Sequence, residues 1–179
     1  MATFGVTADN SDSTASSADR SRVSSASPSS NGTVESLTCR CWVDSGSTVA
    51  KAVIYSDTGS NFPNNLLAVS DELSITNNTE QANTFTFSGA NRISVTSGTT
   101  YWIGVHWQDP GTGNFFVSRD ATAGGNKNDA DTYSDGPETP YNSLAANSTG
   151  IIDAFVTYTA DEAPATAPRF STLSLMGVG

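Results

Sequence analysis

The sequence Thr100-Tyr-Trp-Ile-Gly-Val-His-Trp107 carries the strongest strand signal in this chain. Its aromatic and β-branched residues favour extended structure, and it is apolar at nearly every position. A strand that is apolar on both faces belongs inside a sheet, where both faces are covered. Residues 101–107 are therefore predicted to be an interior strand with a neighbouring strand on each edge.

Residues 34–43 show the period-two alternation of a half-buried strand. The apolar face of this strand carries Leu37, Cys39, Cys41 and Val43. An apolar run at residues 49–55 follows after a turn, and the two strands are predicted to pair antiparallel. Because Cys39 and Cys41 would lie roughly 6.5–7 Å apart on one strand face, too far for a relaxed disulfide, both are predicted to be buried free thiols.

The chain after residue 107 is predicted to continue as a hairpin and then as a long loop. Turn residues at 109–113 separate the interior strand from a short apolar strand at 114–118. Residues 120–150 contain a Gly-Gly pair, an Asp-Gly pair and two prolines, which are typical of loops. A final strand is predicted at 150–159.

Strand signals recur at about the 8–12-residue spacing of an all-β fold, and no segment of helical length has a 3.6-residue period. The predicted fold is a two-sheet antiparallel jelly-roll sandwich over residues 1–159, with its first and last strands paired. Residues 160–179 form an extended tail, which begins with a linker rich in Pro and Ala. The tail ends in an apolar tip whose predicted docking anchors are Phe170, Leu173, Leu175 and Met176. Such a tip can add a strand to a sheet edge or fill a groove on a partner.

Charge and composition exclude several classes of partner. The chain has 179 residues and a net charge of −10, with eight Lys and Arg against eighteen Asp and Glu. It offers no basic surface to a phosphate backbone and no apolar segment long enough to span a bilayer, so neither nucleic acid nor a membrane is expected as a partner. The first residues lack the basic and apolar regions of a secretory signal peptide, and none is predicted.

Two features of the composition point to a virion protein. Ser and Thr supply 49 residues and Lys only two, as is typical of proteins that work outside cells. Free thiols instead indicate folding in a reducing cytoplasm. Virion proteins, which are made in the host cytoplasm and work outside it, combine both properties.

Five short stretches of the chain also carry a resemblance: Phe4-Gly5, Gly32-Thr-Val-Glu-Ser-Leu37, Lys51-Ala-Val-Ile-Tyr-Ser-Asp57, Leu66-Leu-Ala-Val-Ser70 and Ser97-Gly-Thr-Thr-Tyr-Trp-Ile-Gly-Val105. In this order they resemble a jelly-roll β-sandwich module of extracellular bacterial and archaeal proteins and of tailed-phage virion proteins. The likeness covers about residues 3–159. It implies a shape similar to carbohydrate-binding modules and a role in adhesion, anchoring or decoration.

One candidate metal site lies in the acidic segment at residues 126–136. This segment places Asp129, Asp131 and Asp135 close together in sequence, and carboxylate oxygens suit calcium. Asp and Asn are also ordinary turn residues, so a turn without metal is the alternative. No other cofactor is expected.

His106 is the only histidine in the chain. A catalytic histidine needs a nucleophile and an orienting carboxylate, and the chain contains no Gly-x-Ser-x-Gly motif. With Cys39 and Cys41 it supplies three soft ligands, whereas a structural zinc site needs four. His106 is therefore predicted to be structural, and no enzymatic activity is expected.

Aromatic residues give a second candidate site. Trp42, Trp102 and Tyr133, with Phe62 and Tyr141 nearby, are a candidate platform on which sugar rings could stack. The alternative is that these side chains belong to the core, because large aromatic side chains contribute much of the buried area in a sandwich. A host surface glycan is the ligand that such a platform would take.

The predicted function is that of a non-enzymatic virion structural protein, either a capsid decoration subunit or another head-, tail- or fibre-associated subunit. It would contact other virion proteins and copies of itself, with a trimer as the first expectation. The alternative is an extracellular carbohydrate-binding or adhesion module.

Overall fold

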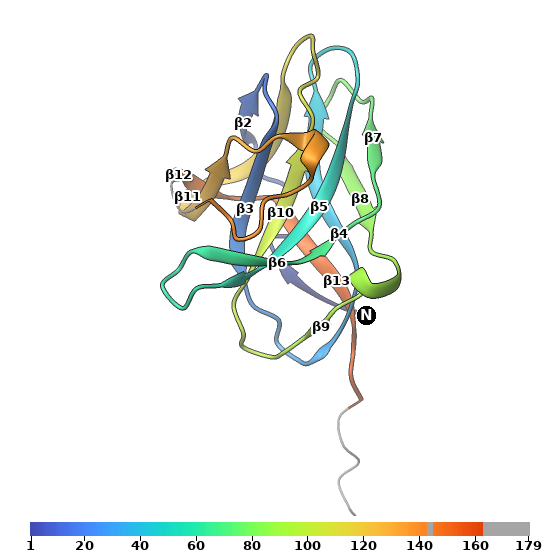
Figure 1. Cartoon of the computed structure of the whole chain (residues 1–179), viewed down its shortest axis with the longest axis vertical. Helices are drawn as coiled ribbons and strands as arrows, with labels where there is room; N and C mark the ends of the chain where they lie inside the picture. The colour runs from blue at the N-terminus through green and yellow to red at the C-terminus, as the bar shows by residue number, and fades with distance from the viewer. Residues whose placement is uncertain (143–144, 163–179) are drawn as a thin grey trace, which may run out of the picture.

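A computed structural model describes residues 1–142 and 145–162, which are almost entirely β-structure (Figure 1). The strands are β1 (Ala2–Gly5), β2 (Asp12–Ser16), β3 (Arg20–Ala26), β4 (Gly32–Val43), β5 (Thr48–Asp57), β6 (Pro63–Val69), β7 (Leu73–Ile75), β8 (Ala82–Thr86), β9 (Ser94–Val95), β10 (Tyr101–Trp107), β11 (Phe115–Asp129), β12 (Ala146–Ile152) and β13 (Ala154–Ala160). Two short 3-10 turns, η1 (Gly89–Asn91) and η2 (Tyr133–Asp135), are the only helical segments among these residues. None of the described helical segments is long and apolar enough to cross a membrane.

The strands form two antiparallel layers. In the first layer the order is β1-β13-β4, and β8 and β9 pair with the other edge of β4. In the second layer the order is β6-β5-β10-β3-β11; β7 also pairs with β5, and β2 and β12 pair with β11. The layers are joined where the last residues of β4 pair with the first residues of β11. The predicted all-β antiparallel architecture is confirmed, and the predicted pairing of first and last strands is present as Ala2 opposite Tyr158.

The main core lies between the two layers. The first layer contributes buried side chains such as Leu37 and Val156, and the second contributes Ile54 and Val105. All seven residues of β10 are buried, and β10 pairs with β3 on one edge and β5 on the other. The prediction of an interior strand at residues 101–107 is therefore confirmed.

The predicted pairing of residues 34–43 with residues 49–55 is wrong. Both segments are strands, β4 and β5, but they lie in different layers. The turn between them passes from one layer to the other instead of reversing within a sheet. It is fixed by two hydrogen bonds with the segment before β11: Asp44 N donates to Asn114 O (3.2 Å), and Asn114 N donates to Asp44 Oδ1 (2.7 Å).

After residue 107, the strands predicted at 114–118 and 150–159 are present, but the hairpin is wrong and the long loop is wrong in part. Residues 109–113 connect β10 to β11, but these two strands do not pair, so they form no hairpin. The predicted loop at 120–150 contains residues 120–129 of β11 and residues 146–150 of β12. Small and polar residues have weak strand propensity, but here the strand is held by its ladders with β3 and β12.

Candidate functional site

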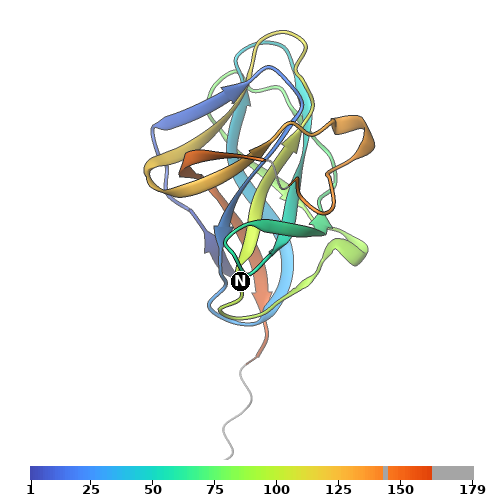
Figure 2. The same cartoon turned by 60° about the vertical axis from the view of Figure 1, so that its left-hand side comes forward.

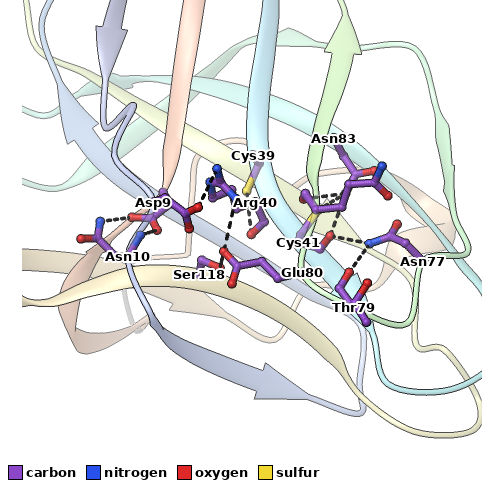
Figure 3. A network of polar contacts seen from close by, with 12 residues as sticks. Asp9, Asn10, Cys39, Arg40, Cys41, Asn77, Thr79, Glu80, Asn83 and Ser118 are labelled. Atoms are coloured by element: carbon purple, nitrogen blue, oxygen red, sulfur yellow. Dashed lines mark hydrogen bonds and ion pairs between the residues drawn. The ribbon is translucent and has the colours of Figure 1, made fainter.

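Polar contacts surround the last residues of β4, where both cysteines lie (Figure 3). Cys39 and Cys41 are free and fully buried, which confirms the prediction of buried free thiols. The side-chain amides of Asn83 and Asn77 donate to the Cys41 carbonyl oxygen at 2.7 and 3.0 Å. A hydrogen bond with the Cys41 thiol and burial raise the pKa of Cys39 well above its usual value. This thiol therefore remains protonated and unreactive.

The Arg40 side chain lies on the side of β4 opposite the two cysteines (Figure 3). It connects β4 to two distant parts of the chain. Its guanidinium lies 3.0 Å from Asp9 and 3.6 Å from Glu80. Ser118 of β11 donates to Glu80 at 2.7 Å. These half-exposed ion pairs fasten the segment between β1 and β2 to both layers, and their role is structural.

The outer face of β10 is covered by residues 130–142, which cross the second layer (Figure 1). His106 is fully buried beneath this covering segment, and its ring stacks on Tyr133 with a centroid distance of 5.0 Å. His106 Nδ1 lies 3.4 Å from Asp131 Oδ2. Burial lowers the pKa of His106 to about 4, and burial raises the pKa of Asp131 to about 6.

These two groups form a closed pair. Neither ring nitrogen of His106 has a hydrogen-bond partner among the described residues, and Tyr133 covers the pair and donates to Glu72 at 2.9 Å. This arrangement offers no path by which a substrate could reach His106. Its burial fits the predicted structural role.

The calcium candidates do not form the predicted cluster. Asp129 and Asp131 are buried, whereas Asp135 is exposed. Asp129 Oδ1 accepts a hydrogen bond from Asn142 (3.0 Å), and Asp131 Oδ2 accepts one from the Glu138 amide (3.0 Å). Within residues 1–142 and 145–162, no three Asp, Glu, His or Cys side chains are arranged to hold a metal ion. The carboxylates serve as turn and loop acceptors instead.

The predicted aromatic platform is not present. Trp102 is 1% exposed and Tyr133 7% exposed, so neither offers a ring face to a sugar. Trp102 belongs to a second core cluster together with Tyr55 and Tyr141. Tyr141 is the member that the covering segment contributes. Trp42 is half-buried and stacks on Phe116 of the neighbouring strand at 5.0 Å. The core alternative explains Trp102 and Tyr133.

Among the concave features of the described surface, two have volumes of about 270 and 260 Å³. The first, the Ile103 cleft, has a volume of about 270 Å³ and opens between the two layers. It is mainly apolar and its lining includes Gly5, Val6, Ala26, Ile103, Ile152 and Ala154. Its position at the end of β1 places it next to a sheet edge. It can accept an apolar side chain.

The second feature, the Lys127 pocket, has a volume of about 260 Å³ and lies on the second layer. Its polar lining includes Ser25, Asn61, Asn126, Lys127, Asn147 and Ser148, and Trp102 also contributes. This pocket was not predicted, because residues 120–150 have the composition of a loop. One signal was available: Lys127 is one of only two lysines in the chain.

The predicted docking anchors Phe170, Leu173, Leu175 and Met176 lie outside the described residues. Comparisons with protein-family models, curated proteins and solved structures find no match for this chain. Its function is therefore inferred from its own residues.

Proposed function

We propose that this protein is a non-enzymatic structural subunit of a virion, and that its C-terminal segment attaches it to a neighbouring copy. The observation that carries the proposal is the position of β1. This strand forms one edge of the first layer and begins beside the end of β13, from which the C-terminal segment continues (Figure 2). A tail that emerges there starts next to a sheet edge of its own subunit.

The edge of β1 has backbone groups available for another strand. Among the described residues, β1 pairs only with β13. Val6 N donates to Ala154 O at 2.8 Å, which fixes the alternation of this antiparallel ladder. The backbone N–H and C=O groups of Phe4 therefore face β13, whereas those of Thr3 and Gly5 face away from it. Unpaired groups of this kind favour the addition of a strand.

The Ile103 cleft lies at the end of this edge and supplies a place for an apolar anchor. Gly5 belongs both to β1 and to the cleft lining. In the tail, Leu173 and Leu175 are two residues apart, so they face the same side if the tail adds as a strand. Edge pairing and an apolar cleft together match the chemistry of the tail.

The partner is a second copy of this chain. Pro164 and Pro168 favour an extended linker of about 3.1 Å per residue, which carries the tip on the order of 25 Å from Thr159. If each copy contacts the next in the same way, the copies form a closed ring, and a trimer is the expected form.

Deletion of residues 165–179 tests this proposal. The melting temperature of the truncated monomer should stay nearly unchanged, because the described core lies within residues 1–160. Size-exclusion chromatography with light scattering should show the intact chain as an oligomer and the truncated chain as a monomer. A truncated chain that still assembles with full affinity would overturn the proposal.

Matched variants locate the contact. Serine at the four predicted anchors should abolish assembly, whereas alanine at Ser171, Thr172 and Ser174 should not. On the receiving side, Thr3→Pro removes an outward N–H from β1 without breaking its ladder with β13, and should also weaken assembly. Electron microscopy of virions that contain the protein tests the virion assignment itself, since the subunit should appear on the particle.

A carbohydrate-binding module is the second candidate function. The Lys127 pocket is the specific observation in its favour.

A further inference from the structure

We propose that the Lys127 pocket binds a single sugar acid, meaning a ring that carries several hydroxyl groups and one carboxylate. The pocket is formed where β11 and β12 meet the loop that follows β5, on the outer side of Trp102. Its residues differ from the predicted aromatic platform except for Trp102. This inference stands independently of the proposed assembly role.

The charge of the pocket is the first argument. The chain has a net charge of −10, yet the lining of this pocket contains one lysine and no Asp or Glu. The other lysine, Lys51, lies 3.7 Å from the Glu72 carboxylate. Among the ion pairs of the described residues, none includes Lys127. A carboxylate ligand would supply the missing counter-charge.

The position of the Lys127 ammonium is fixed by its neighbours. It lies 5.0 Å from the ring centroid of Phe62 and 5.8 Å from that of Trp102, and it donates to Asn147 Oδ1. An ammonium has three N–H groups, so at least one donor remains for a ligand. The Asp57 carboxylate accepts a hydrogen bond from Trp102 Nε1 at 2.7 Å and does not line the pocket.

The amides give the pocket its preference for hydroxyl groups. Asn126 is 1% exposed, and its Nδ2 donates to Thr149 O and Gly150 O at 3.2 and 3.0 Å. Its Oδ1 is buried and has no hydrogen-bond partner among the described residues. Since Asn147 Oδ1 accepts from Lys127, the Asn147 amide group remains a donor.

The size of the pocket limits the ligand to one ring. Pockets for drug-sized molecules span about 300–1,000 Å³, and this one holds about 260 Å³. One wall is the irregular part of β11 between Asp120 and Gly125, where the ladder with β12 shifts. At Gly124, φ is +47°, and a Cβ atom would lie 2.7 Å from Ile151, so glycine is required for this wall.

Titration of the ¹⁵N-labelled full chain with sodium glucuronate tests the proposal. Saturable changes in chemical shift are expected at the Trp102 indole N–H and at the backbone amides of residues 124–127. Glucose, which lacks the carboxylate, and sodium acetate, which lacks the ring, should each bind at least about tenfold more weakly, because each loses one class of contact. Equal binding of glucose or acetate, or no saturable shift with glucuronate, would overturn the proposal.

Two lysine variants form a matched pair. Lys127→Met should weaken glucuronate binding about tenfold or more, and Lys51→Met, which removes the other lysine over an aromatic ring, should leave it unchanged. Asn61→Gly is a second pocket variant, since Asn61 is exposed and its φ of 58° suits glycine. It should weaken binding about threefold or more. Unchanged binding in both Lys127→Met and Asn61→Gly would contradict the assignment.

Discussion

His106 Nδ1 lies 3.4 Å from Asp131 Oδ2, and both side chains are buried under the covering segment. Burial lowers the pKa of His106 to about 4 and Lys51 adds to this effect, while Asp19 and Asp135 oppose it. Burial raises the pKa of Asp131 to about 6, and the carboxylates of Glu138, Asp129 and Asp135 add to this effect. The pair therefore affects stability in opposite directions over the same pH range.

Replacing Asp131 by Asn should make the protein more sensitive to acid. Between pH 6.5 and about 4 the unfolded chain protonates His106 and the folded chain does not, so this residue lowers stability as pH falls. Asp131 takes up its proton near pH 6 when folded and near 3.8 when unfolded, so it raises stability as pH falls through this range. Asp131→Asn leaves only the first effect, of at most about 1.4 kcal/mol per pH unit.

Urea unfolding at pH 7, 6, 5 and 4 provides the measurement. Relative to the unaltered chain, Asp131→Asn should lose stability toward pH 4, and His106→Asn should gain it. The other carboxylates are common to all three proteins and cancel in the comparison. If the free energies of unfolding of the two variants changed in parallel with pH, the pair would not titrate as described.

Replacing Gly104 by Ala should destabilise the protein by about 1–3 kcal/mol or more, because overpacking forces the backbone to move. Its Cβ would lie 1.9 Å from the Arg22 carbonyl oxygen on β3. Gly125→Ala is the control, since its Cβ would meet nothing closer than Ser148 O at 3.4 Å. Denaturation monitored by the fluorescence of the buried tryptophans measures both. Equal stability of the two variants would contradict the close approach of β10 and β3.

Replacing Val105 by Asp should prevent folding. Val105 is fully buried between the layers, and an unpaired buried carboxylate costs several kcal/mol, comparable with the whole stability of a small domain. Leu67→Asp is the control, because Leu67 is 38% exposed. Circular dichroism and solubility distinguish the two. A soluble Val105→Asp protein with an unchanged melting temperature would show that β10 is peripheral.

Neither thiol should react with a bulky reagent in the native protein. Cys39 and Cys41 are fully buried, and the raised pKa of Cys39 leaves little thiolate to attack. Both should react once urea unfolds the chain, and mass spectrometry counts the labels. Rapid labelling of two thiols without denaturant is the contrary result.

Local pattern was sufficient to predict some strands. Residues 34–43 and 101–107 each bury side chains in the way that their alternation or apolar character indicates, so β4 and β10 could be located. Their partners could not, because a period-two pattern specifies a buried face and says nothing about which edge pairs with which. The pairing of Cys39 with Ala154, more than a hundred residues away, depends on packing across the whole sandwich.

The polar sites were hidden for a related reason. Lys127 and Asn147 meet only because β11 and β12 pair, and the Gly124-Gly125 pair just before Lys127 is typical of a loop. The segment that covers Trp102 could not be identified from β10 alone, since Tyr141 lies some forty residues later. The chemical character of these residues could be read from the sequence, but which of them lie next to each other could not.

The pairing of β1 with β13 also constrains when this protein can fold. Residues 2–5 have no strand partner until residues 155–158 leave the ribosome, and one edge of β4 depends on the same strand. Closing so large a loop loses chain entropy before any contact compensates for it, and folds rich in such distant pairings form in milliseconds to seconds. The first layer is therefore complete only after nearly all of the described chain has been translated, and a nascent chain that stalls before β13 leaves one edge of β4 unpaired.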